Sequence, residues 1–314
     1  AQAKAAFSPV VSIAGALSTA HQYRDAFQEV DQQSLFTPIT KKTWTVPSAD
    51  RVPEIIREGF RAAMTPRCGP VQINLPRDVL AAQADYAAMP SPAQYRNQSL
   101  PHPDSTLLEQ AARMLASAPR PVIVIGGGIK NSMAHEDALK LAETLNTPIC
   151  TAPGHGDAIP FGHPLNAGQM GPRGNRVASR LVREADVILA LGTRLGFNST
   201  FYSYDNINAE AAIIQVEIEP TAIGRYFPVE LGIWGDAAET ARQLTRLIEK
   251  AADRADADAW LSAYSAEKAA FLKQRDADAD MSLPIQPSGL FRTMRGVFPS
   301  CLLYTSDAAD EGFC

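Results

Sequence analysis

Several apolar runs between residues 121 and 234 end in residues that could bind a nucleotide. Each run has the length of a buried strand, and glycines after such a strand let backbone N–H groups approach a phosphate. An arginine there could pair with a phosphate or carboxylate, and an acidic side chain at a strand end could hold a ribose hydroxyl. The candidates are Gly126, Gly127, Gly128, Gly192, Thr193, Arg194, Glu217, Gly235 and Asp236.

The glycine triplet also has a purely structural interpretation. Gly126–Gly128 do not have the G-x-G-x-x-G spacing of a dinucleotide site, and residues 129–132 are expected to separate them from the next helix. A tight turn at the carboxyl edge of the sheet is therefore an alternative to nucleotide contact, and Arg194 could simply cap and pack. The convergence of four strand ends on one crevice favours binding more than any single motif does.

Other reactive side chains are predicted to be structural. The histidines His155 and His163 share a loop with Asp157. A metal site would need a third ligand at a spacing and geometry that suit a metal, and the sequence supplies none. The two histidines are therefore predicted to be loop hydrogen bonders. Cys68 and Cys150 lie beside apolar segments and are predicted to be packed thiols.

The elements that would position these residues alternate between strand and helix. Beyond the glycine candidates the pattern predicts five strand–helix repeats, which make a Rossmann-like, doubly wound and mostly parallel α/β domain. The expected strands are 121–125, 147–151, 186–191, 212–218 and 229–234, and the expected helices are 104–115, 135–145, 174–184 and 237–252.

The first part of the chain predicts half of a second open α/β domain, with strands at 8–15 and 69–76 around a helix at 52–64. A proline-rich stretch at 89–103 predicts an extended linker between the two domains. Residues 253–285 are rich in Ala, Asp and Lys and predict a second linker, with a surface helix at 259–273.

Composition excludes several classes of function. The chain has 314 residues and a formal net charge of −5, with acidic and basic residues interspersed, so no basic face for nucleic acid is expected. No apolar run approaches the roughly 18 residues of a membrane span. Cys68 and Cys150 are too few for a disulfide framework, so the cytoplasm is the default compartment.

A spaced series of motifs then points to a family. The first part contains Asp25-Ala-Phe-Gln-Glu-Val-Asp31, Thr40-Lys41 and Gly69-Pro-Val-Gln-Ile-Asn-Leu-Pro-Arg-Asp78, in that order. This series resembles the thiamine diphosphate-dependent enzymes of the acetolactate synthase group. The resemblance continues through Asp157-Ala-Ile-Pro160, His163-Pro-Leu-Asn-Ala-Gly168, Ala185 to Arg194, Ile214 to Pro220 and Gly235-Asp-Ala237. Within the group, the segments 27–36 and 156–168 look most like sulfoacetaldehyde acetyltransferase.

The resemblance implies a domain plan. Residues 1–88 would be the C-terminal part of a pyrimidine-binding domain, and 104–252 a central domain of the DHS-like NAD/FAD-binding class. Residues 286–300 would begin a diphosphate-binding domain. The last segment, 301–314, is similar to translated adapter sequence and is expected to be a sequencing artefact.

The resemblance also implies a function. The complete protein would be a carboligase or acyltransferase for 2-oxo acids or related aldehydes, dependent on thiamine diphosphate and Mg²⁺, and a homodimer or homotetramer. Phe27, Gln28 and Lys41 would line the cofactor and substrate cleft, while Asp25 and Glu29 would organise the loop. The activating glutamate is expected before Ala1 and the Mg²⁺-binding Gly-Asp-Gly…Asn motif after Pro299. The chain itself is therefore expected to be inactive and to hold no catalytic or metal-binding residue.

Two alternatives stay open at this point. The group contains members with and without FAD, and the segment after Arg194 lacks the acidic Phe-Asp-Asp-Arg pattern of the flavin-binding synthases, which disfavours FAD. In another functional class, residues 104–252 alone could be a non-catalytic NAD- or FAD-binding module. That alternative leaves the motifs between Asp25 and Asp78 unexplained.

Overall fold

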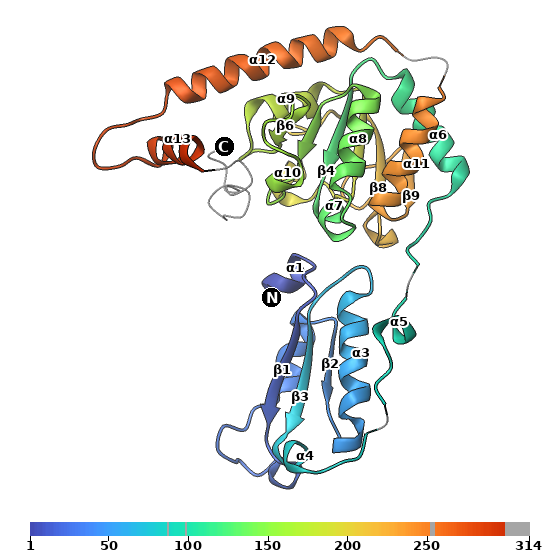
Figure 1. The fold of residues 1–314 in the computed structure, drawn as a ribbon, viewed down its shortest axis with the longest axis vertical. Helices are drawn as coiled ribbons and strands as arrows, with labels where there is room; N and C mark the ends of the chain where they lie inside the picture. The colour runs from blue at the N-terminus through green and yellow to red at the C-terminus, as the bar shows by residue number, and fades with distance from the viewer. Residues whose placement is uncertain (87, 98, 252–254, 299–314) are drawn as a thin grey trace. The chain divides into compact units, whose positions relative to one another are not determined.

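The computed structural model describes residues 1–86, 88–97, 99–251 and 255–298. The chain forms two compact units, residues 1–100 and 101–314, and each is described by itself (Figure 1). The expected artefact at 301–314 lies outside the described residues, as do 252–254 and the end of the segment 286–300.

A three-stranded parallel sheet in the order β1-β3-β2 forms the centre of the first unit. The strands are β1 (Val11–Ala16), β2 (Lys42–Thr45) and β3 (Val71–Pro76). The helices are α1 (Gln2–Ala5), α2 (Gln32–Phe36), α3 (Val52–Met64), α4 (Arg77–Ala81) and α5 (Pro92–Tyr95).

Helix α3 covers one face of this sheet. Its bounds are those predicted from the spacing of its apolar residues. Ile55 of α3 packs with Ile73 and Leu75 of β3, because alternate residues of a strand point to the same face. Strand β2 was not predicted, since Lys42-Thr-Trp-Thr45 contains no apolar run; it forms by pairing in parallel with β3.

A six-stranded parallel sheet in the order β6-β5-β4-β7-β8-β9 forms the centre of the second unit. Its strand order reverses between β4 and β7, as in the 3-2-1-4-5-6 order of dinucleotide-binding folds, which confirms the predicted doubly wound class. The strands are β4 (Pro121–Ile125), β5 (Ile149–Thr151), β6 (Asn166–Gln169), β7 (Val187–Leu191), β8 (Ala212–Glu217) and β9 (Leu231–Trp234).

The helices of the second unit match most of the predicted ones. Asp104 accepts hydrogen bonds from the backbone N–H groups of Thr106 and Leu107 and so caps the first of them, as predicted. The helices are α6 (Ser105–Ser117), α7 (Gly127–Asn131), α8 (His135–Leu145), α9 (Arg176–Glu184), α10 (Phe197–Thr200), α11 (Ala237–Glu249), α12 (Asp258–Ala277) and α13 (Pro287–Val297).

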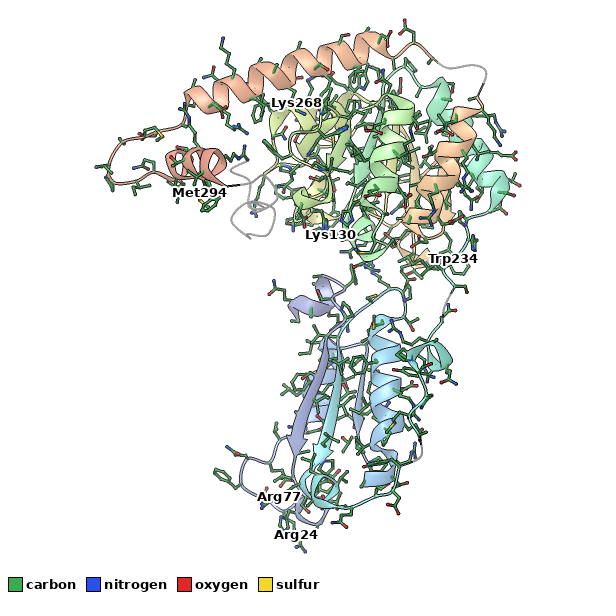
Figure 2. All side chains as sticks on the ribbon, viewed as in Figure 1. Arg24, Arg77, Lys130, Trp234, Lys268 and Met294 are labelled. Carbon is green, nitrogen blue, oxygen red and sulfur yellow. The ribbon has the colours of Figure 1, made fainter. Side chains whose placement is uncertain are left out.

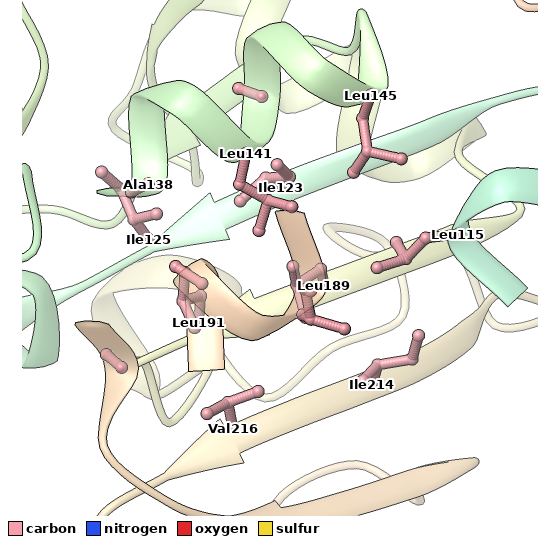
Figure 3. Close-up of a cluster of buried hydrophobic side chains, with 14 of the residues drawn as sticks. Leu115, Ile123, Ile125, Ala138, Leu141, Leu145, Leu189, Leu191, Ile214 and Val216 are labelled. Atoms are coloured by element: carbon pink, nitrogen blue, oxygen red, sulfur yellow. The ribbon is translucent and has the colours of Figure 1, made fainter. Parts of the chain in front are cut away.

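Apolar side chains of the strands alternate between two cores. Ile123, Leu189 and Ile214 pack on the face covered by α6, α8 and α11 (Figure 3). Val122 and Ile188 pack on the opposite face, against α9 and α12. Helices therefore cover both faces of the sheet, and its carboxyl edge is the place left for a ligand. Every helix among the described residues is too short or too polar to cross a membrane.

Three features of the second unit differ from the predictions. Strand β6 adds a sixth strand that the polar sequence Asn166-Ala-Gly-Gln169 did not reveal. Helix α7 begins at Gly127, directly after β4, so residues 129–132 do not separate the glycines from a helix. Helix α12 is more than a surface connector, because its Trp260 and Tyr264 are buried in the core.

Candidate functional site

The nine predicted nucleotide-binding residues all lie at the carboxyl edge of the six-stranded sheet. Gly126–Gly128 follow β4, Gly192–Arg194 follow β7, Glu217 ends β8, and Gly235 and Asp236 follow β9. Because the strands are parallel, their carboxyl ends meet at one edge. Figure 2 shows Lys130, from α7, and Trp234, from β9, at this same edge.

The glycines after β4 are in close contact with the loop after β7. The N–H group of Gly128 donates to the carbonyl oxygen of Gly192 at 2.9 Å. A Cβ atom on Gly128 would lie 2.6 Å from the Cα atom of Gly192, and one on Gly126 would lie 2.7 Å from the Cβ atom of Thr193. Glycine is therefore required here for loop-to-loop packing, whether or not a ligand binds.

Asp236 is occupied by contacts within the protein. Its side chain caps α11 by accepting from the N–H groups of Ala238 and Glu239, at 3.0 and 3.1 Å. The hydroxyl of Ser132 also donates to it, at 2.5 Å. Asp236 is 2% exposed, and a Cβ atom on Gly235 would meet Pro103 at 3.0 Å. These two residues therefore join α11 to the rest of the edge.

Thr193 and Glu217 are buried, and Arg194 is partly buried. The carbonyl oxygen of Thr193 accepts from the side-chain amide of Gln215 at 3.3 Å. Glu217 accepts from the N–H group of Ile218 at 3.1 Å. Glu217 is thus placed at the edge as predicted, and the residue is 7% exposed.

His155 lies against the first turn of α7. A Cβ atom on Gly127 would be 3.1 Å from its Cε1 atom, so glycine at 127 leaves room for the ring. Burial, together with the positive charge of Lys130, lowers the pKa of His155 to about 4, although Asp157 acts in the opposite direction. The imidazole is therefore neutral near pH 7.

The two histidines differ in their hydrogen bonding. His163 accepts from the N–H group of Leu165 at 3.2 Å and lies 3.3 Å from the carboxylate of Glu143, which makes it a loop hydrogen bonder as predicted. The Nδ1 atom of His155 is buried and has no hydrogen-bond partner, while the backbone of His155 donates to Ala152 and accepts from Ala158 within the loop. Among the described residues no group of three or more His, Cys, Asp or Glu is arranged to hold a metal ion.

Several hydrogen-bond donors at this edge are already used within the protein. A pyrophosphate group on a glycine turn needs backbone N–H donors. The N–H groups of Gly126, Gly128 and Ile129 donate instead to Leu191, Gly192 and Gly126. Lys130, the basic residue of α7, forms an ion pair with Asp157. The turn is therefore packed as a structural junction between loops.

In the first unit, Phe27 and Gln28 lie in the loop between β1 and α2. Phe27 is 86% exposed, and Gln28 has a left-handed backbone with φ of 61°. The loop starts at the carboxyl end of β1, which in parallel α/β sheets is the end where ligands bind. Figure 2 shows Arg24 of this loop at the same end of the unit as Arg77, the first residue of α4.

Lys41 does not lie with Phe27 and Gln28. It precedes β2, at the amino end of the sheet, and its N–H group donates to the carbonyl oxygen of Pro70. Its Nζ atom donates to the carbonyl oxygens of Thr65 and Arg67, at 2.9 and 2.8 Å. Strand β3 alone separates the two ends by about 20 Å at about 3.3 Å per residue. These contacts hold Lys41 at the C-terminal end of α3, and its predicted place in the cofactor and substrate cleft stays a prediction.

Asp78, the last residue of the motif at 69–78, lies in the first turn of α4. The N–H group and the hydroxyl of Thr19 donate to its carboxylate, at 3.1 and 2.5 Å. These hydrogen bonds lower the pKa of Asp78 below its ordinary value. The contact joins the loop after β1 to the helix after β3. Its signal in the sequence is the Leu-Pro-x-Asp motif, which places a carboxylate at the carboxyl end of β3.

Comparison with known proteins gives a family for this fold. A family model for the central domain of thiamine pyrophosphate enzymes matches residues 108–244, from α6 to α11. A probable acetolactate synthase large subunit from Methanococcus aeolicus is 33% identical over 303 residues, which cover 92% of this chain and 50% of that protein.

Two further relatives are also similar over most of this chain. The sulfoacetaldehyde acetyltransferase of Rhodobacter capsulatus is 39% identical over 259 residues, or 81% of this chain and 43% of the relative. The acetolactate synthase large subunit of Corynebacterium glutamicum is 32% identical over 272 residues, or 85% and 43%. The chain thus spans about half the length of the curated relatives that it matches.

The matched lengths exceed either unit taken alone, so the likeness extends over both. The motifs that suggested the family are distributed in the same way, from Asp25 to Ala237. Residues 108–244 match the central domain of the thiamine pyrophosphate enzymes, and the chain is similar to an acetolactate synthase large subunit over 92% of its length.

Proposed function

We propose that the complete protein is a thiamine diphosphate-dependent carboligase or acyltransferase that acts on a 2-oxo acid or a related aldehyde. The observation that carries this proposal is the likeness to acetolactate synthase large subunits over 92% of the chain, through both units. A family model for one domain would not by itself distinguish an enzyme from a nucleotide-binding module. The likeness of the first unit is what favours an enzyme.

Phe27 and Gln28 are proposed to face the cofactor and substrate. An exposed aromatic ring and a neutral amide suit an uncharged, partly apolar intermediate, since neither brings a charge that would have to be desolvated. Bound thiamine diphosphate would supply the nucleophilic carbanion and the electron sink of the reaction. This chain's residues would shape the cleft and orient the substrate.

Mg²⁺ is part of the proposal, as the ion that screens the diphosphate. The described residues offer no cluster of three or more acidic or histidine side chains for it. Its ligands are therefore proposed to lie outside the described residues. The proposed domain plan is a pyrimidine-binding part at 1–88, a central domain at 104–252 and the start of a diphosphate-binding domain at 286–300.

A homodimer or homotetramer in the cytoplasm is proposed for the complete protein, because such enzymes build the cofactor site from two subunits. Neither nucleic acid nor membrane is proposed as a partner. Acidic and basic residues are interspersed along the sequence, which has a formal net charge of −5, so the composition does not indicate a basic patch for a phosphate backbone.

Sulfoacetaldehyde acetyltransferase activity is the alternative within the family. It is supported by the 39% identity to the Rhodobacter capsulatus protein, over a shorter stretch than the match to the acetolactate synthases. The non-catalytic module receives no support from the comparisons. The internal contacts of Gly126, Gly128 and Asp236 also weigh against a nucleotide at the sheet edge.

The test is an assay of the complete protein, purified and supplied with thiamine diphosphate and Mg²⁺. Pyruvate and sulfoacetaldehyde are offered separately, and their consumption is followed by NMR. Cofactor-dependent loss of pyruvate supports the synthase proposal, whereas loss of sulfoacetaldehyde alone supports the alternative. Consumption of neither substrate by a folded, cofactor-loaded protein would overturn both.

A further inference from the structure

The loop that carries Phe27 and Gln28 has an unusual backbone. Tyr23, Asp25 and Gln28 have φ values of 62°, 54° and 61°. Left-handed conformations are unfavourable for residues other than glycine, and they persist only where surrounding contacts hold them. The loop therefore requires a stabilising partner close to these three residues.

Glu29 is that partner. One oxygen of its carboxylate accepts from the N–H group of Tyr23 at 2.5 Å, and the other accepts from those of Arg24 and Ala26 at 3.3 and 3.0 Å. Hydrogen bonds from these backbone groups, Tyr23 first, lower the pKa of Glu29 below its ordinary value. The carboxylate is thus ionised near neutral pH and acts as a charged acceptor for three amides at once.

Both ends of the loop are anchored separately. Thr19 donates twice to Asp78 at the start, and Asp31 accepts from the N–H group of Ser34 at the first turn of α2. Glu29 consequently determines the conformation of the middle of the loop, where Phe27 and Gln28 lie, and not the attachment of the loop to the sheet.

We propose that Glu29 is a positioning residue for the reaction, which rests on the function proposed above. It acts through the backbone: its carboxylate fixes residues 23–26 and so fixes the direction in which Phe27 and Gln28 leave the turn. A neutral side chain of the same shape cannot accept all three hydrogen bonds, because an amide has one oxygen. The pair of acceptor oxygens of the carboxylate is therefore the essential property.

The first test uses this chain and needs no activity. Hydrogen exchange of the Tyr23, Arg24 and Ala26 amides is measured by NMR in the wild type, in Glu29→Gln and in Glu54→Gln. Glu54 is a matched control, since it is an exposed glutamate on α3 in the same unit and pairs with Arg51, just before that helix. We expect at least one of the three amides to exchange about tenfold faster in Glu29→Gln, which corresponds to one lost hydrogen bond to a charged acceptor. Unchanged exchange in Glu29→Gln would overturn the proposal.

The second test uses the complete enzyme. Glu29→Gln should change the KM or the preference between two substrates in the same direction as Phe27→Ala, and Glu54→Gln should change neither. Faster exchange combined with unaltered KM, kcat and preference would show that Glu29 only stabilises the loop, and would overturn the positioning role. If the wild-type enzyme consumes neither substrate, the proposed function fails, and the exchange measurement alone decides whether Glu29 holds the loop.

Discussion

The N–H group of Gly128 donates to the carbonyl oxygen of Gly192 at 2.9 Å, and this bond joins the two loops at which the strand order of the second unit reverses. Each glycine occupies the space in which a side chain of the other would lie. The two loops are therefore in direct backbone contact where the strand order reverses, with no room for a side chain at Gly128 or Gly192.

Replacing Gly192 by alanine should destabilise the second unit by about 3 kcal/mol, which combines a left-handed backbone with a steric clash. Its φ is 64°, and the new Cβ atom would lie 2.8 Å from the Cα atom of Gly128. Urea denaturation followed by circular dichroism measures the loss. Gly196→Ala is the control, because no atom lies within 4 Å of its Cβ position. Equal midpoints for the two variants would contradict the packing argument.

The backbone hydrogen bonds of the turn after β4 predict that the complete protein carries no stoichiometric flavin. The N–H groups of Gly126, Gly128 and Ile129 already have acceptors within the protein, so an FAD pyrophosphate would have to displace them. The measurement is the absorbance spectrum released when the purified protein is denatured. A flavin spectrum near one equivalent per chain would show that the loops rearrange around the cofactor.

The stability of the second unit should decrease below about pH 6.5 because of His155. In the folded state burial keeps its pKa at about 4, whereas in the unfolded chain it takes up a proton near its ordinary value of 6.5. Below pH 6.5 the unfolded state binds more protons than the folded state. The stability that depends on neutral His155 is therefore fully present above pH 6.5 and is lost as the pH falls towards 4. The loss is about 3 kcal/mol.

Thermal unfolding between pH 7 and pH 4 tests this expectation. His155→Gln should flatten the pH dependence, since glutamine does not titrate. His102→Gln is the matched control, because the side chain of His102 is 73% exposed. A wild type and a His155→Gln variant with parallel pH profiles would rule out His155 as the cause.

Helix α12 should contribute to the stability of the second unit through Trp260. This side chain is 7% exposed, and its indole N–H group donates to the carbonyl oxygen of Pro121 at 3.0 Å. Trp260→Ala should cost about 3–5 kcal/mol, as is typical of a large buried aromatic residue. Trp234→Ala, at a position that is 54% exposed, should cost clearly less in the same denaturation experiment. A similar cost at both positions would mean that α12 is only loosely attached.

Helices were predictable where the same pattern of apolar residues recurs from one turn to the next. The bounds of α3 and α8 agree with their predicted ranges because their apolar residues recur at helical spacing. Strands β2 and β6 were missed because Lys42-Thr-Trp-Thr45 and Asn166-Ala-Gly-Gln169 are short and polar. They are strands only because a neighbouring strand pairs with them, which is information from the tertiary structure.

The location of the candidate residues was easier to predict than their contacts. Parallel strands end at one edge, so the sequence placed Gly126, Gly192 and Asp236 together. It could not reveal that Ser132 would donate to Asp236, because the two residues are 104 positions apart. The contacts of Lys41 could not be predicted either, since its partners, Thr65 and Arg67, follow the C-terminal end of α3.

Phe27→Ala and Gln28→Ala in the complete enzyme should change rate or substrate preference without unfolding the protein. Phe27 is 86% exposed, so the core of the first unit does not depend on its ring, while a ligand at the carboxyl end of β1 could pack against it. We expect a change of about tenfold or more in the ratio of kcat/KM for two substrates, comparable to the loss of one apolar contact in a pocket.

The control for this experiment is Leu80→Ala, on α4 at the same end of the sheet. Leu80 is an apolar residue that is 59% exposed and carries no proposed role. Its removal tests whether any loss of exposed apolar surface near the site has the same effect. Circular dichroism melting of all three variants separates a kinetic effect from unfolding. If the kinetics of Phe27→Ala and Gln28→Ala equal those of Leu80→Ala, the loop after β1 does not form part of the substrate site.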